Sequence, residues 1–450
     1  MDSIISASRA LRTGALTSAA LTERAIQAYG RHGEATNAFI TFMPDAAMAQ
    51  ARACDEDARH GRWRGALHGI PISIKDLIDV KGTATTAGSR VLSSTPAAQD
   101  ATVVARLREA GAVVLGKTNL HEFAFGTTGE DSAFGAVRNP LDLDRMAGGS
   151  SSGSAAAVAS GIGLGSVGTD TGGSIRIPAA LCGLVGLKPS YGEVPVDGVV
   201  PLCPSFDHAG PIGLSVADVW TMWTVMAGVD DPPRPARDLR GLRVGVPSEY
   251  FFDLLEDGVR AAWDAAVERL TRRGVRIQPV SIPHAASTPD AYVPIVFRES
   301  WAWHQRFIEQ CPDRYTPAVR TRLEMGRSVG AGDYARAMAA REVLAREVEA
   351  SLADVDALAL PTMPVTAPRL GTTDIRFGER VEPVRAVMLR LTQLFDITGH
   401  PAITLPMTAA GTLPCGFQLV GRRQRTPDLL AIAQAVEAAL GGALPQASLA

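Results

Sequence analysis

The chain has 450 residues, of which 46% are hydrophobic and 20% are charged, and its formal net charge is −3. This composition is typical of a globular protein with a large core, and it excludes a disordered chain. The charge balance provides no broad basic surface, so we expect neither a nucleic acid nor an anionic membrane as a partner.

The spacing of the cysteines and the polarity of two segments indicate in which cellular compartment the protein is expected. The five cysteines are far apart and form no CxxC pair, which argues against a disulfide framework and against a zinc knuckle. Residues 1–9 contain no basic segment followed by an apolar stretch. The low-polarity run at 155–168 is too short and too glycine-rich to cross a bilayer. We therefore expect a cytoplasmic protein.

Helices and strands alternate from the beginning of the chain. A first helix is expected at 17–29. Isoleucines then recur at every second position of 70–74, which is the period of a strand, and this strand ends near Lys75 and Asp76. In a strand, successive side chains point to opposite faces, so Asp76 should point away from Lys75.

The alternation continues to the C-terminus. Asp100 is expected to cap a helix that runs to Ala110. Further elements are predicted as strands at 112–116, 242–246 and 275–282 and as helices at 257–273 and 426–440. Strands separated by such helices favour an α/β protein with a mainly parallel sheet covered on both faces. We interpret 230–235 (DDPPRP) as a surface loop within one domain rather than as a linker.

The segment 146–178 is unusually rich in glycine, serine and alanine. Residues 149–153 match GxSxG, but no buried strand precedes them, as a nucleophile elbow would require. Residues 163–168 match GxGxxG, but a glycine-rich loop follows where a dinucleotide-binding motif needs a helix. We therefore reject both motifs.

The tight loop formed by Thr171, Gly172, Gly173 and Ser174 suggests a different chemistry. Glycines allow backbone N–H groups to converge without obstruction, so such a loop can form an oxyanion hole beside a serine nucleophile. The nucleophile needs a base. A histidine remains an option, and the alternative is Lys75, kept neutral by burial at the end of an apolar strand.

Several ordered segments together resemble the amidase signature family, and they cover most of the chain. They are 69–80 (GIPISIKDLIDV), 116–119 (GKTN), 134–140 (FGAVRNP), 148–158 (GGSSSGSAAAV), 168–178 (GTDTGGSIRIP), 182–189 (CGLVGLKP), 207–213 (DHAGPIG), 356–361 (DALALP), 399–405 (GHPAITL) and 416–421 (GFQLVG). The resemblance implies a three-layer α/β/α sandwich around a large mixed, mainly parallel sheet. It implies a single amidase domain over 1–450, with a signature core at about 60–220 and a C-terminal portion at about 236–450 that completes the sheet and the substrate pocket.

The resemblance also implies the roles of individual residues. Ser174 matches the family nucleophile, Ser150 the bridging serine with a cis peptide bond, and Lys75 the catalytic lysine. The backbone of residues 171–174 matches the oxyanion loop. Asp170 and Arg176 match positions that shape this loop. No metal and no organic cofactor is needed for this chemistry.

The implied activity is cleavage of the C–N bond of an amide, or of a carbamate (urethane), through an acyl-enzyme on Ser174. The open alternative is the A-type subunit of a glutamine-dependent tRNA amidotransferase. A small-molecule amide or carbamate is the expected partner, and a homodimer is an open option. Substrate-binding residues are expected in the 123–131 loop, at Phe125, Gly126 and Thr127, and between positions 292 and 396. Aromatic candidates are Trp301, Trp303 and Phe395.

Overall fold

The computed structural model describes residues 3–408 and 412–441. Eleven strands form one sheet in the order β1-β3-β2-β6-β8-β7-β14-β15-β11-β9-β10. Their bounds are β1 Phe39–Phe42, β2 Pro71–Lys75, β3 Val113–Thr118, β6 Gly165–Asp170, β7 Val185–Lys188, β8 His208–Gly213, β9 Arg243–Pro247, β10 Arg276–Val280, β11 Ala357–Pro361, β14 Ala402–Leu405 and β15 Phe417–Val420. Two small hairpins lie outside this sheet, formed by β4 Arg138–Asn139 with β5 Asp142–Met146 and by β12 Asp374–Phe377 with β13 Arg380–Pro383.

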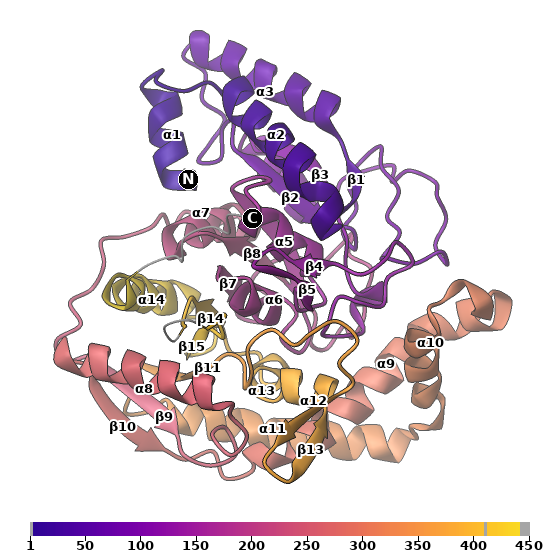
Figure 1. The fold of residues 1–450 in the computed structure, drawn as a ribbon, viewed down its shortest axis with the longest axis vertical. Helices are drawn as coiled ribbons and strands as arrows, with labels where there is room; N and C mark the ends of the chain where they lie inside the picture. The colour runs from indigo at the N-terminus through magenta and orange to yellow at the C-terminus, as the bar shows by residue number, and fades with distance from the viewer. Residues whose placement is uncertain (1–2, 409–411, 442–450) are drawn as a thin grey trace.

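The strand pairing confirms the expected large mixed sheet. Parallel pairs join β3 to β2 and β2 to β6 near one end, and β11 to β9 and β9 to β10 at the other. The strands between these groups pair antiparallel. Figure 1 shows the sheet running from the purple strands β2 and β3 to the pink β9 and β10, so both halves of the sequence contribute to one sheet.

Helices cover both faces of the sheet. Their bounds are α1 Ile4–Arg12, α2 Ser18–Thr36, α3 Pro44–Arg59, α4 Thr102–Glu109, α5 Ser152–Ala159, α6 Arg176–Leu181, α7 Val216–Ala227, α8 Asp257–Arg272, α9 Thr288–Gln310, α10 Pro317–Glu324, α11 Ala331–Ser351, α12 Val384–Leu389, α13 Gln393–Ile397 and α14 Thr426–Leu440. Helices α9, α10 and α11 lie together beside the C-terminal part of the sheet (Figure 1).

The glycines of strand β6 make room for helices on both faces. A Cβ atom on Gly165 would lie within 2.4 Å of the Met222 sulfur on α7. A Cβ atom on Gly168 would lie 2.8 Å from the Ser151 hydroxyl, on the opposite face. Since neither helix could approach a larger residue so closely, Gly165 and Gly168 of the GxGxxG pattern reflect helix–sheet packing in this chain.

Most predicted elements form close to their expected bounds, with two differences. Helix α2 continues to Thr36, where Asn37 ends it in a left-handed conformation. The prediction that Asp100 caps a helix is wrong, because the N-cap of α4 is Ala101. The Asp100 carboxylate instead accepts the backbone N–H of Lys81 at 2.7 Å and pairs with Arg108.

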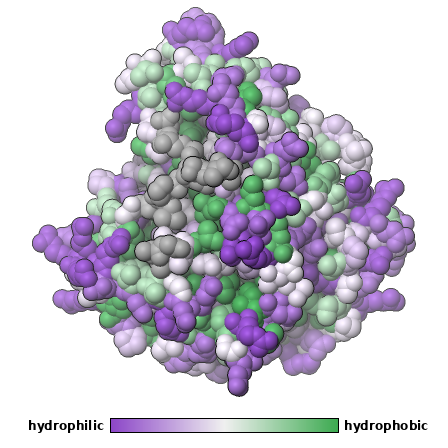
Figure 2. All heavy atoms as spheres, in the orientation of Figure 1, coloured by the Kyte–Doolittle hydropathy of each residue, from purple (hydrophilic) through white to green (hydrophobic). Residues whose placement is uncertain are grey.

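The helices of the described residues include none that is both long and apolar enough to cross a membrane. On the face drawn in Figure 2, hydrophilic residues occupy much of the outline and hydrophobic residues form small groups nearer the middle. Among the described residues, no group of three or more His, Cys, Asp or Glu side chains is arranged to hold a metal ion.

Candidate active site

Three hydroxyl groups surround the amino group of Lys75 at the end of strand β2. The Lys75 Nζ atom lies 2.8 Å from Ser150 Oγ, 2.9 Å from Ser151 Oγ and 2.8 Å from Thr169 Oγ1. Lys75 is 0% exposed. The two serines lie at the start of α5, and the peptide bond between Gly149 and Ser150 is cis.

The hydrogen bonds of Lys75 are compatible with a neutral amine. Ser151 Oγ donates its proton to the carbonyl of Thr169 at 3.1 Å, so it must accept from Lys75. A neutral amine has two N–H groups and one lone pair. If the N–H groups serve Ser151 and Thr169, the lone pair faces the remaining hydroxyl, which belongs to Ser150.

Burial favours the neutral amine. It lowers the pKa of Lys75 to about 7, although the negative charges of Asp170 and Asp207 act in the opposite direction. Asp76, the next residue in the chain, forms an ion pair with Lys117 instead, at 2.6 Å. The expected opposite orientation of Asp76 is therefore confirmed.

Asp170 shapes the loop that carries Ser174. Its carboxylate accepts the backbone N–H groups of Gly173 and, at 3.1 Å, of Ile175. It also binds Arg176 Nε at 3.0 Å. Burial acts to raise the pKa of Asp170, but the charge and hydrogen bonds of Arg176 hold this pKa well below its usual range. An ionised carboxylate thus fixes the turn between β6 and α6.

The loop places Ser174 next to the segment that follows Ser150. The backbone N–H of Ser151 donates to the carbonyl of Ser174 at 3.2 Å, so the segment that follows Ser150 touches Ser174 directly. Ser174 is 5% exposed. Because Gly173 donates its N–H to Asp170, that amide is already occupied, whereas those of Gly172 and Ser174 have no protein acceptor within 3–408 and 412–441.

Comparisons with known proteins match most of the chain. A family model named Amidase matches residues 20–430. The A subunit of the Glutamyl-tRNA(Gln) amidotransferase of Chloroflexus aurantiacus is 38% identical over 96% of each protein. Among solved structures, one described as an amidase has a TM-score of 0.93 and 40% identity, and the match covers 98% of this chain and 100% of the other. The corresponding A subunit of Thermotoga maritima has a TM-score of 0.80 and 32% identity, with 95% and 94% covered.

The chain belongs to the amidase signature family. In this amidase signature protein, the motifs at 69–80, 148–158 and 168–178 converge on one buried site, although they are distant in sequence.

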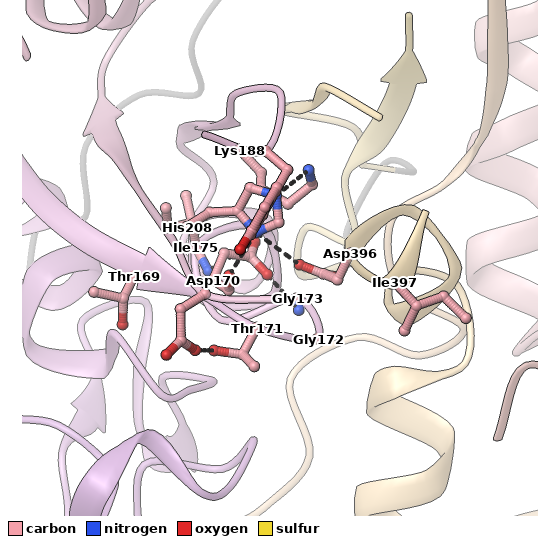
Figure 3. Close-up of polar contacts among 12 residues, drawn as sticks. Thr169, Asp170, Thr171, Gly172, Gly173, Ile175, Lys188, His208, Asp396 and Ile397 are labelled. Carbon is pink, nitrogen blue, oxygen red and sulfur yellow. Dashed lines mark hydrogen bonds and ion pairs between the residues drawn. The ribbon is translucent and has the colours of Figure 1, made fainter. Parts of the chain in front are cut away.

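A second layer of buried polar residues supports the loop from the C-terminal half. Arg176 pairs with Asp396 of α13 and donates to Gln418 Oε1 at 2.8 Å. The Asp396 carboxylate also lies 3.9 Å from His208 Nδ1 (Figure 3). Neither Asp396 nor Gln418 was expected from the sequence, because no local pattern marks a partner more than 200 positions away.

Lys188 and His208 complete this layer of the amidase signature fold. Lys188 Nζ donates to the carbonyls of His400, at 2.6 Å, and Pro189, and it lies 3.3 Å from His208 Nε2. Burial lowers the pKa of Lys188 to about 7. His208 Nδ1 lies 3.1 Å from the carbonyl oxygen of Asp170, so the layer contacts the loop directly (Figure 3).

The residues expected to bind substrate fall into two groups. Gly126 and Thr127 line a pocket together with His121, Arg322 and Arg385. Phe125 is 1% exposed. Phe395 is buried and lies parallel to Phe251, whereas Trp303 is partly buried and packs against Phe123 and Phe307. Arg322 and Arg385 lie between positions 292 and 396, and they were not singled out from the sequence.

Proposed function

We propose that this chain hydrolyses the C–N bond of a carboxamide through an acyl-enzyme on Ser174. The observation that carries the proposal is the hydrogen bond of 2.8 Å between Lys75 and Ser150, made by a fully buried lysine whose pKa is lowered to about 7. A neutral lysine can take a proton from a serine hydroxyl, whereas an ammonium group cannot.

The proposed reaction uses the three residues in sequence. Ser150 passes its proton to Lys75 and takes the proton of Ser174, whose oxygen attacks the substrate carbonyl carbon. The proton then returns through Ser150 to the nitrogen as the C–N bond breaks, and an amine or ammonia leaves. A water molecule next attacks the acyl group and loses its proton to the same relay. The products are a carboxylic acid and free Ser174.

The tetrahedral intermediate carries a negative oxygen that needs hydrogen-bond donors. We propose the amides of Gly172 and Ser174 for this task, with that of Thr171 nearby. The N–H group of Gly173 is not proposed as an oxyanion donor, because it already donates to the Asp170 carboxylate. The Gly173 φ of +136° lies where residues with a side chain are strained.

A second candidate function is the A-type subunit of a glutamine-dependent tRNA amidotransferase. Its support is the 38% identity to the A subunit of the Chloroflexus aurantiacus enzyme over 96% of each chain. In that case the ammonia released from glutamine would pass to a partner protein. The same residues would serve in both functions, so the site alone does not separate them.

One assay discriminates between the two functions. The purified chain is incubated alone with simple primary amides, aryl amides, carbamates and glutamine, and released ammonia or amine is measured. Turnover of simple amides or carbamates by the chain alone supports the hydrolase. Glutamine turnover that requires a second protein of the amidotransferase supports the alternative. A Ser174→Ala protein with unchanged turnover contradicts both.

A further inference from the structure

Arg385 of α12 is a partly buried cation without a counter-charge. Its Nε atom is buried and has no hydrogen-bond partner among the described residues, and no ion pair of Arg385 occurs within them. An unpaired buried polar group of this kind is costly to keep, and a charged one is more costly. Burial lowers the pKa of Arg385, and Tyr292 is the neighbour that opposes this shift.

A second arginine lies near the same aromatic ring. The guanidinium carbons of Arg385 and Arg322 lie 5.5 Å and 5.6 Å from the ring centre of Phe125. Burial, followed by the charge of Arg385, lowers the pKa of Arg322 to about 10. Arg322 donates to the backbone carbonyl of Phe125. Two cations are therefore held close together although they repel each other.

The acidic residues of the pocket already have partners. Glu130 accepts the backbone N–H of Gly371 at 2.6 Å. Asp131 lies 3.2 Å from His121 Nε2, and this histidine lowers the pKa of the Asp131 carboxyl. Asp131 acts on Arg322 only as a nearby charge. Neither carboxylate accepts a hydrogen bond from Arg385 Nε in the part of the chain that the structure describes.

The pocket adjoins the proposed reaction centre on two sides. Leu389 lies one helical turn after Arg385 on α12, so both point to the same face of that helix. A Cβ atom on Gly172 would lie 3.1 Å from Leu389. A Cβ atom on Gly149 would lie 3.1 Å from the carbonyl carbon of Thr127, which lines the pocket. Along the axis of α12, Arg385 and Leu389 are about 6 Å apart, because each helical residue adds about 1.5 Å.

We propose that Arg385 binds a carboxylate of the substrate, so that the natural substrate is a half-amide of a short dicarboxylic acid. A guanidinium group matches a carboxylate with two parallel hydrogen bonds, which supplies the missing counter-charge. Arg322 adds positive potential to the same pocket. This inference rests on the proposed amide hydrolysis and names its substrate class.

Matched substrate pairs test the proposal. The half-amides of malonic, succinic and glutaric acid are compared with neutral analogues in which a methyl ketone replaces the carboxylic acid. Wild-type protein should prefer an acid to its neutral analogue by about 10- to 100-fold in kcat/KM. Arg385→Gln should remove this preference and leave the neutral analogue within about threefold, and Arg385→Lys should restore part of it.

The control variant is Arg390→Gln, which removes another partly buried arginine from the same region. Arg390 lies over the Tyr250 ring at 3.8 Å and does not line the pocket. The Arg390→Gln variant should therefore keep the wild-type preference for the acid over its neutral analogue. Two results would overturn the proposal while leaving amide hydrolysis intact. One is that Arg385→Gln lowers kcat/KM equally for the acids and for their neutral analogues. The other is that the wild-type protein does not prefer the acids.

Binding gives a readout that is independent of turnover. Calorimetric titration of the same half-amides into Ser174→Ala should show binding that Arg385→Gln weakens at least tenfold. Absence of this binding, or binding unaffected by Arg385→Gln, would refute the carboxylate site even if no tested amide is hydrolysed.

Discussion

Asp76 and Lys117 form a fully buried ion pair at 2.6 Å, although Asp76 directly follows Lys75 in the chain. The alternation of side chains along β2 places the two neighbours on opposite faces of the sheet. The carboxylate closest in sequence to Lys75 is thus neutralised by another lysine, and Lys75 lies among hydroxyl groups.

The first prediction concerns the pH dependence of activity. Because burial lowers the pKa of Lys75 to about 7, the lysine becomes charged as the pH falls through that value and can no longer accept a proton. We expect kcat/KM to fall on the acid side of about pH 7. Lys75→Ala should lose roughly 100-fold or more in acylation rate and also lose this acid limb.

Lys188 is the control for this assignment, since burial lowers its pKa to about 7 as well. A Lys188→Met variant that remains folded should keep the acid limb. If the limb disappears in Lys188→Met and persists in Lys75→Ala, Lys75 is not the base.

The second prediction is that Ser174→Ala lowers turnover at least about 1000-fold without unfolding the chain. Circular dichroism and thermal denaturation should match the wild-type protein. A sulfonylating or acylating reagent should modify Ser174, as located by mass spectrometry. Modification of another serine with the same loss of activity would contradict the assignment.

The third prediction separates stability from catalysis. Lys117→Met leaves the buried carboxylate of Asp76 without its cation, so the free energy of unfolding should fall by about 3–5 kcal/mol. Chemical denaturation measures this change. Arg272→Met removes the exposed ion pair with Glu268 and should have little effect. A Lys117→Met protein as stable as Arg272→Met would show that the buried ion pair contributes little.

The fourth prediction concerns the proposed oxyanion loop. A methyl group on Gly173 would overlap the Thr392 hydroxyl, and its φ of +136° disfavours alanine. Gly173→Ala should therefore lower kcat more than it raises KM. Gly192 has a φ of +81° and open space around it, so Gly192→Ala should strain the backbone without lowering kcat. Similar kinetics in both variants would argue against a role for the loop.

The fifth prediction is that activity requires no metal ion. We expect full turnover after prolonged treatment with EDTA, because the proposed relay needs only serine and lysine side chains. Loss of activity that added zinc restores would contradict this mechanism.

Much of the fold could be predicted because its signals are local. The isoleucines at 70, 72 and 74 mark β2 within one residue, and Pro427 with Gly441 mark the ends of α14. Lys75, Ser150 and Ser174 could be assigned roles because their motifs resemble those of a known family. The geometry then places Lys75 beside Ser150, and Ser174 against the adjoining segment.

Other features could not be predicted because they depend on distant contacts. Arg176 forms an ion pair with Asp396, which lies 220 positions later in the sequence. Arg385 resembles any surface arginine in the sequence, and only the folded chain shows that it lacks a counter-charge among the described residues. Asp100 precedes a helix, which is the usual position of an N-cap. Its carboxylate instead accepts the backbone N–H of Lys81 and pairs with Arg108.

The position of β14 in the sheet has a consequence for synthesis of the protein. Strand β7 pairs with β14, which follows about 200 residues later in the chain. At ribosomal rates this interval lasts roughly 10 to 40 s, during which an edge in the middle of the future sheet stays unpaired. Exposed strand edges promote aggregation. Expression of the folded protein should therefore depend on chaperones that protect the nascent N-terminal half, and on translation that reaches β14 without a long pause.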